Sequence, residues 1–116
     1  MTERNYCIED LNEIPPTSCP CGTTRRAFVN DESQLLTTHL LEISVDSKVH
    51  YHKKITEVYV ILEGEGHMEL DGEKIAVKPM SSILIKPGCR HRAVGKLKVL
   101  LTAIPAFNPE DEWFDE

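Results

Sequence analysis

The chain has 116 residues, with 13 Lys or Arg against 19 Asp or Glu, so its formal net charge is −6. This length suits one domain, and 41% hydrophobic with 28% charged residues is typical of a globular protein. No apolar run approaches the roughly 20 residues that a membrane helix needs, so we expect no membrane association. An acidic chain also lacks the clustered basic footprint of a nucleic-acid-binding protein. Four cysteines without a secretory signal favour a reduced, cytoplasmic protein.

The negative charge is concentrated at the C-terminus. The last eight residues, PEDEWFDE, contain five acidic side chains and no basic one, and the rest of the chain is nearly neutral. The same segment contains Trp113 and Phe114, two large aromatic side chains that we expect to dock on a neighbouring surface, including one across a dimer. We therefore predict a loop-rich arm over residues 1–24, a barrel over 25–108 and an acidic tail over 109–116.

The predicted elements are almost all strands. Residues 1–22 are expected to be loop, because their three prolines disfavour regular structure. After this segment, runs rich in β-branched and apolar residues predict strands at 25–29, 35–45, 57–62, 67–70, 74–77, 82–85 and 98–104. The glycines at 64 and 66 are expected to end the third of these, and Asp71-Gly72 predicts a tight hairpin. No segment has a helical period, so the predicted fold is all-β, an antiparallel sandwich or barrel.

Three histidines and one glutamate form the pattern that carries chemistry. His50 and His52 are two residues apart, so on a strand their side chains leave the same face. Glu57 opens the next predicted strand, and His91 follows a tight Pro-Gly turn. Neutral imidazoles together with a carboxylate suit a first-row divalent metal ion.

At these positions the sequence resembles the cupin superfamily. The first family motif matches His50-x-His52, four residues, Glu57, six residues and Gly64, and the centre of the second matches Gly88-x-x-His91. Both motifs open with a glycine in the family, where this chain has Ser44 and Met80. The resemblance implies a single-domain cupin-type antiparallel β-barrel (jelly roll).

The resemblance also implies one divalent metal ion, held inside the barrel by His50, His52, Glu57 and His91. Fe(II), Mn(II), Ni(II) and Zn(II) all accept this ligand set, so the identity of the metal stays open. The alternative is a metal-free cupin, sugar-binding or structural, in which these histidines are leftovers without a metal to bind.

Three further residues are predicted to face the substrate. Tyr59 shares the face of Glu57 by strand alternation, and His39 lies on a predicted strand where it can point inward. Of the adjacent pair Arg25 and Arg26 at most one can face the barrel interior, and we assign Arg25 to it. An inward arginine suits a small anionic substrate, because a guanidinium binds a carboxylate through two hydrogen bonds.

The resemblance favours a metal-dependent enzyme, and an oxygenase in particular, because three imidazoles and one carboxylate suit redox-active iron. Alternatives are a metal-dependent decarboxylase or isomerase, a non-catalytic binding or sensor cupin, and a structural dimer. The apolar face of Val58, Val60 and Leu62 predicts a second sheet layer or a homodimer interface. Cys19 and Cys21 match neither a redox C-x-x-C pair nor half of a zinc site, so no role follows from their spacing.

Overall fold

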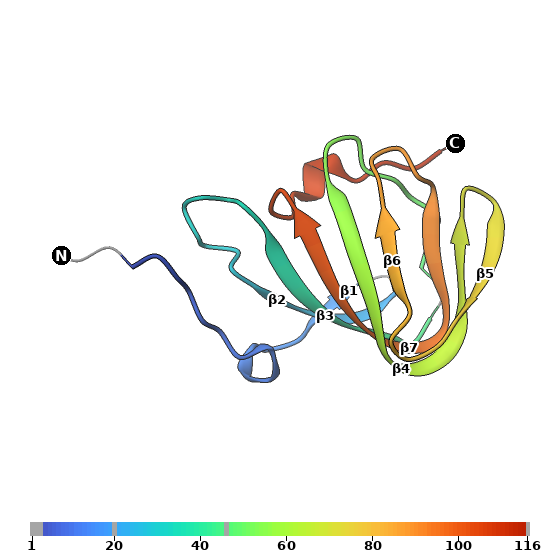
Figure 1. Cartoon of the computed structure of the whole chain (residues 1–116), viewed down its shortest axis with the longest axis horizontal. Coiled ribbons are helices and arrows are strands. Elements are labelled where there is room, and N and C mark those ends of the chain that lie inside the picture. The colour runs from blue at the N-terminus through green and yellow to red at the C-terminus, as the bar shows by residue number, and fades with distance from the viewer. Residues whose placement is uncertain (1–3, 20, 46, 116) are drawn as a thin grey trace.

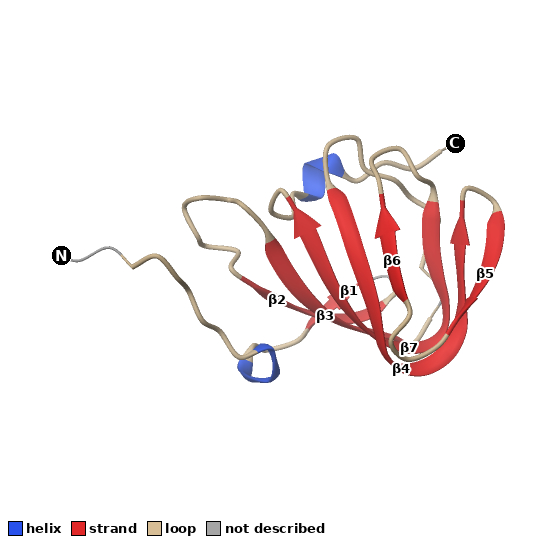
Figure 2. Ribbon diagram, in the orientation of Figure 1, coloured by secondary structure: helices blue, strands red, loops and turns tan. Residues whose placement is uncertain are grey.

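The computed structural model describes residues 4–19, 21–45 and 47–115, which form almost only antiparallel strands (Figure 2). The strands are β1 (Thr17–Cys19), β2 (Gly22–Ala27), β3 (Thr37–Ile43), β4 (Thr56–Leu70), β5 (Glu73–Val77), β6 (Ser82–Ile85) and β7 (His91–Ile104), and the 3-10 helices are η1 (Leu11–Glu13) and η2 (Pro109–Asp111). The prediction of an all-β fold is confirmed. Parts of the predicted arm and tail, residues 1–3, Pro20 and Glu116, lie outside the described residues, as does Asp46.

The strands form one sheet that folds over into a barrel. Its order is β1-β2-β3-β7-β4-β5, and β6 pairs with the same edge of β4 as β5 does. On one edge β4 pairs with β7 along nearly its whole length, while on the other edge it pairs first with β6 and later with β5. Figure 1 shows both long strands, β4 and β7, curving round the closed side of the barrel. No described helix has the length and apolar character needed to cross a membrane.

The bend in β4 corrects one prediction. The segments 57–62 and 67–70, predicted as separate strands, form one strand that continues through the glycines at 64 and 66. A Cβ atom on Gly64 would lie 2.2 Å from the carbonyl oxygen of Lys96, and one on Gly66 would lie 2.3 Å from that of Val94. These glycines therefore do not end the strand. They allow the backbone of β4 to lie against its paired strand β7 at a distance that no other residue permits.

Two sharp turns follow this bend. Asp71 and Gly72 have φ values of +49° and +85°, which confirms the predicted hairpin between β4 and β5. Met80 has a φ of +75°, at the position where the cupin motif has glycine. Met80 is 79% exposed, so its side chain meets no obstacle in this conformation. The chain therefore keeps the family's turn without a glycine.

The N-terminal part of the sheet begins earlier than predicted. The strand β1 lies inside the segment predicted to be loop, and β2 begins at Gly22 and not at Arg25. The β1–β2 hairpin extends the sheet on the outer edge of β3. Before it, the chain runs away from the barrel as an extended segment (Figure 1).

Strand alternation decides which side chains fill the barrel. Tyr59 and Ile61 are buried, as predicted, with 5% and 0% exposure. The alternate residues Val58 and Val60 face outward and are half-buried. Inward side chains of β3, β4 and β7 form most of the core. The core thus occupies the barrel interior, next to the buried Glu57.

The acidic tail docks on its own barrel. The backbones of Tyr51 and Trp113 exchange two hydrogen bonds of 2.9 Å, and the buried Asp111 carboxylate accepts from three consecutive backbone N–H groups, those of Lys53, Lys54 and Ile55. In Figure 1 the short red helix η2 lies over one end of the barrel. The predicted docking of the tail is therefore intramolecular in this structure.

Candidate metal centre

The four predicted ligands converge at one end of the barrel. One nitrogen from each of His50, His52 and His91 and one Glu57 oxygen all lie within 4.8 Å of one another. His50 and His91 are held side by side, because their backbones exchange hydrogen bonds of 2.9 and 3.1 Å. Among the described residues this is the one group of three or more side chains that could hold a metal ion.

Each histidine is oriented by a backbone carbonyl. His50 Nδ1 donates to Lys48 O at 2.8 Å, His52 Nδ1 to Asp111 O at 2.7 Å and His91 Nδ1 to Cys89 O at 2.9 Å. A carbonyl oxygen can only accept, so every Nδ1 carries the hydrogen. In the neutral imidazoles every Nε2 therefore carries a lone pair, which is the form that binds a metal ion.

The Nε2 atoms of His52 and His91 face the carboxylate of Glu57. Glu57 Oε1 lies 3.3 Å from His52 Nε2 and 3.1 Å from His91 Nε2, and His52 Nε2 is buried without a hydrogen-bond partner. Lone pairs at these distances repel one another unless positive charge lies between them. Protons on the imidazoles can supply that charge, and so can a divalent cation. The donor set of three nitrogens and one oxygen fits a first-row divalent ion.

Electrostatics keep Glu57 ionised. Burial opposes its charge, but His52 and His91, which face the carboxylate and stabilise it when their Nε2 atoms carry protons, outweigh burial and lower the pKa of Glu57 to about 2. The pKa of His52 is raised, because its burial is outweighed by the carboxylate of Glu57. The site therefore carries a fixed negative charge that attracts a cation.

The C-terminal tail supports the candidate metal centre. The backbone carbonyl of Asp111 orients His52, while the Asp111 carboxylate fixes the turn between His52 and β4. Burial raises the pKa of this carboxyl, but the N–H groups that it accepts lower it below its ordinary value. Sequence reasoning missed this role, because an acidic tail carries no motif for a contact 59 residues away.

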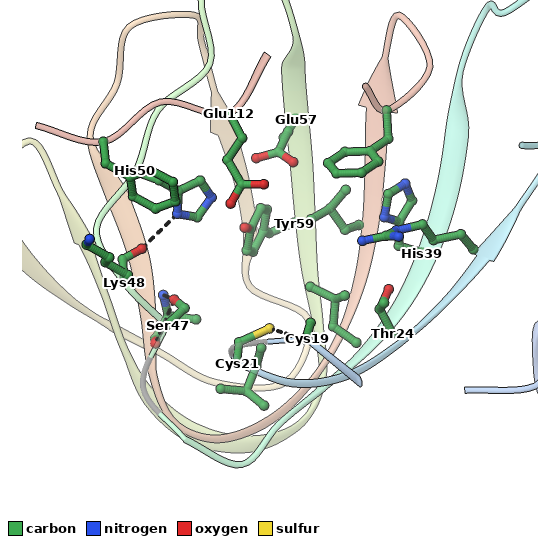
Figure 3. A pocket seen from close by; sticks show the side chains of 17 residues that line it. Cys19, Cys21, Thr24, His39, Ser47, Lys48, His50, Glu57, Tyr59 and Glu112 are labelled. Atoms are coloured by element: carbon green, nitrogen blue, oxygen red, sulfur yellow. Dashed lines mark hydrogen bonds between the residues drawn. The ribbon is translucent and has the colours of Figure 1, made fainter. Parts of the chain in front are cut away.

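A cavity of about 200 Å³ adjoins the metal centre (Figure 3). Its lining residues include His50 and Glu57 of the centre, the predicted Tyr59 and His39, and several residues that the sequence analysis did not assign to a cavity: Thr24, Arg26, Lys48, Phe107, Glu112 and Phe114. Burial raises the pKa of Tyr59 well above its ordinary value, so its hydroxyl stays protonated. Figure 3 places Tyr59 between the Glu57 end of the cavity and a pair of cysteines.

The assignment of Arg25 to the cavity is wrong, and Arg26 takes that place. Arg25 points to the opposite face of β2, where its guanidinium donates to the carbonyls of Asn12 and Ile14 at 2.9 Å. Arg26 pairs across the sheet with His39 and lines the cavity. The register of β2, which starts at Gly22, decides between the two arginines.

His39 is a neutral cavity side chain. Thr37 Oγ1 accepts from the backbone N–H of Phe107 at 3.0 Å and lies 2.8 Å from His39 Nε2. The Thr37 hydroxyl can thus donate to Nε2, which leaves His39 Nδ1–H as a donor for a ligand. Burial, followed by the nearby Arg26 guanidinium, lowers the pKa of His39 to about 4.

The fold and the four-residue group define a cupin. The family model described as "Cupin domain" matches residues 39–101, and the chain belongs to this family. Over 75 residues, or 60% of each protein, it is 41% identical to "Uncharacterized protein MJ1618" of Methanocaldococcus jannaschii. The chain thus spans less than two thirds of that relative's length.

Two solved structures extend the comparison over nearly the whole chain. A protein from Planctomyces limnophilus is 34% identical, with a TM-score of 0.87 over 94% of this chain and 96% of that one. Pac13 of Streptomyces, a nucleoside dehydratase, was crystallised as a variant with uridine. It is 19% identical, with a TM-score of 0.82 over 99% of this chain and 92% of that one, and this likeness shows the fold alone.

His39 gives a pH-dependent prediction. Its pKa of about 4 in the folded state lies below the ordinary value of 6.5, so between these values the unfolded chain takes up a proton that the folded chain refuses. Stability is therefore lost as the pH falls. We expect His39→Gln to reduce the loss between about pH 7 and pH 5 by about 2 kcal/mol, measured by urea denaturation.

The matched control is His67→Gln, which changes a histidine that does not line this cavity. Because this variant keeps His39, it should keep the loss of stability that is assigned to His39. An equal loss of stability in the His39→Gln variant and the unmodified protein would contradict the assignment.

Proposed function

We propose that this cupin is a metal-dependent enzyme that acts on a small anionic molecule. The observation that carries the proposal is the convergence of three tethered Nε2 atoms on Glu57, in the wall of a cavity with an unpaired arginine. A divalent ion held by His50, His52, Glu57 and His91 would supply a Lewis acid with open coordination positions. Fe(II), Mn(II), Ni(II) and Zn(II) remain the candidate ions.

Arg26 supports the anionic charge of the substrate. Its Nε is buried without a hydrogen-bond partner, and its guanidinium lies 4.4 Å from the centre of the Phe107 ring. No carboxylate of the described residues forms an ion pair with it. Lys48 is a second cation in the cavity wall, 4.8 Å from the centre of the Phe114 ring. A carboxylate or phosphate of a ligand would satisfy the guanidinium of Arg26.

For the reaction type we propose an oxygenase. Three neutral imidazoles and one carboxylate suit a redox-active ion such as iron. In the cavity, the protein's own side chains would bind and orient the substrate: Arg26 through its charge, and Tyr59 and His39 as hydrogen-bond donors. The rings of Phe107 and Phe114 would limit the access of water.

Proton-transfer chemistry, such as dehydration, isomerisation or decarboxylation, is the second candidate. Glu112 supports it, because this carboxylate lines the cavity close to His50 and can act as a general base. The structurally similar Pac13 is a nucleoside dehydratase. A non-catalytic binding or sensor cupin is the third candidate, and it would hold a ligand in the same cavity without converting it.

Metal content and oxygen consumption test the proposed function together. Protein purified without a nickel column should hold about one metal ion per chain, and a His50→Ala/His52→Ala double variant should lose it. His67→Ala is the matched control and should keep the metal. Equal metal in the unmodified protein and the double variant would contradict the proposal.

Oxygen uptake by the metal-loaded protein is then measured with a panel of small carboxylates and thiols. An oxygenase consumes oxygen with one of them, and the double variant does not. Conversion of a ligand without oxygen uptake would support proton-transfer chemistry. Binding without conversion would support the sensor alternative.

The two adjacent arginines separate substrate binding from stability. We expect Arg26→Ala to weaken binding of the best carboxylate of this panel by roughly 10- to 100-fold, because a charged hydrogen-bond donor is lost. Arg25→Ala is the matched control and should leave affinity unchanged while it loosens the N-terminal segment. Titration calorimetry measures the affinity of each variant for the carboxylate. Equal affinities of the two variants would contradict the role of Arg26.

The predicted homodimer also remains a proposal. The outer face of the sheet is apolar: Val58 pairs with Leu84, and Leu62, Leu84 and Ile104 are 38%, 59% and 46% exposed. An apolar face of this kind favours association of two copies. Light scattering tests it, and the molar mass of a single chain would contradict it.

A further inference from the structure

Two cysteines lie together in the wall of the cavity, outside the metal-binding group. Cys19 ends β1, and it pairs across the hairpin with Gly22, the first residue of β2. Cys21 precedes Gly22, and its Sγ lies 2.6 Å from Cys19 Sγ. Both side chains line the cavity, and in Figure 3 their sulfur atoms face each other on the far side of Tyr59 from Glu57.

The backbone fixes this pair in place. The carbonyl oxygen of Cys21 accepts from the N–H groups of Ser44 and Val45, at 2.9 and 3.3 Å. A Cβ atom on Gly22 would lie 2.0 Å from the carbonyl oxygen of Glu42, so only glycine permits this close approach of β2 to β3. Cys21 is thus tied to the chain that leaves β3, and both thiols are held at the cavity wall.

The pair differs from the two other cysteines of the chain. Cys7 Sγ contacts the Asp31 carboxylate, and Cys89 Sγ lies near the carbonyl oxygen of Arg90. In the described part of the chain, neither has a second thiol within hydrogen-bond distance. Two adjacent thiols are the arrangement that can exchange two electrons by forming a disulfide.

The surroundings distinguish the two sulfur atoms. Burial, followed by the hydrogen bond with Cys19, raises the pKa of Cys21 to about 12. Cys21 also packs against the hydrophobic core, and Cys19 is not among the residues of that cluster. Because Cys21 is held against the core, we assign Cys19 as the nucleophile and Cys21 as the thiol that resolves the intermediate.

We propose that Cys19 and Cys21 are a redox-active thiol pair that reduces a hydroperoxide entering the cavity. The Cys19 thiolate attacks the terminal peroxide oxygen and breaks the O–O bond. The alkoxide leaves, takes up the proton released from Cys19 and becomes an alcohol, while Cys19 becomes a sulfenic acid.

Cys21 then attacks the Cys19 sulfur and breaks its S–O bond. The hydroxyl group leaves with the Cys21 hydrogen as water, and an intramolecular disulfide forms. In total, one hydroperoxide is reduced to an alcohol and water while two thiols are oxidised. A small thiol regenerates the pair by disulfide exchange. The apolar side chains of Leu41 and Ile43 in the same cavity suit an alkyl hydroperoxide.

A Cys7→Ser/Cys89→Ser variant tests the proposal, because it keeps only this pair. After one equivalent of tert-butyl hydroperoxide, its intact mass should fall by two hydrogen atoms, its free thiols should disappear, and a small thiol should reverse both changes. Two free thiols after treatment, or oxygen added to both sulfur atoms, would overturn the proposal.

The reaction should proceed equally in the protein as purified and after treatment with a chelator, because neither cysteine belongs to the metal-binding group. A failure of the metal proposal therefore leaves this one intact. Oxidation that occurs only with metal bound would assign the chemistry to the metal and overturn the proposal.

Single variants on the same background test the order of attack. Cys21→Ser should accumulate a sulfenic acid on Cys19 that dimedone captures, whereas Cys19→Ser should show little reaction. Equal or reversed labelling would overturn the assigned roles. Should a serine variant fail to fold, the intact-mass measurement still decides whether the pair reacts, because it keeps both cysteines.

Discussion

The structure depends on bringing three histidine nitrogens and one carboxylate oxygen within 4.8 Å of one another inside a barrel. Groups with lone pairs repel at this distance, so the arrangement needs both mechanical support and positive charge. Three backbone carbonyls give the support by accepting the Nδ1 hydrogens. A divalent cation supplies this positive charge. The geometry of the four side chains is therefore itself a reason to expect a metal ion.

Support for the centre comes from distant parts of the chain. Asp111 uses its carbonyl to orient His52 and its carboxylate to hold the following turn, so one residue near the C-terminus stabilises a ligand near the middle. The opposite wall of the cavity comes from β2 and β3, which contribute Arg26 and His39. The cavity is therefore lined both by the first strands of the sheet and by the C-terminal tail. This links folding of the terminal segments to the chemistry of the site.

The parts of this architecture that were predicted correctly depend on local spacing. The grouping of His50, His52, Glu57 and His91 follows from residues two and five apart and from one motif, and the inward position of Tyr59 follows from strand alternation, whereas metal binding by the group stays a proposal. Arg25 was assigned wrongly because the register of β2 with β3 decides which side chains of β2 face the cavity. This register begins at Gly22, next to a hairpin that the sequence did not predict. The single long strand β4 was missed because Gly64 and Gly66 permit a close approach to the paired strand β7, and a linear pattern does not contain this contact. The role of Asp111 has no local signal at all.

Diffraction from crystals of the protein, recorded at the absorption edge of the metal it carries, tests the central claim most directly. The account predicts one anomalous peak per chain, within coordination distance of the Nε2 atoms of His50, His52 and His91 and of the Glu57 carboxylate. A metal-loaded crystal with no peak at this position, or with the peak at Cys19 and Cys21, would contradict it.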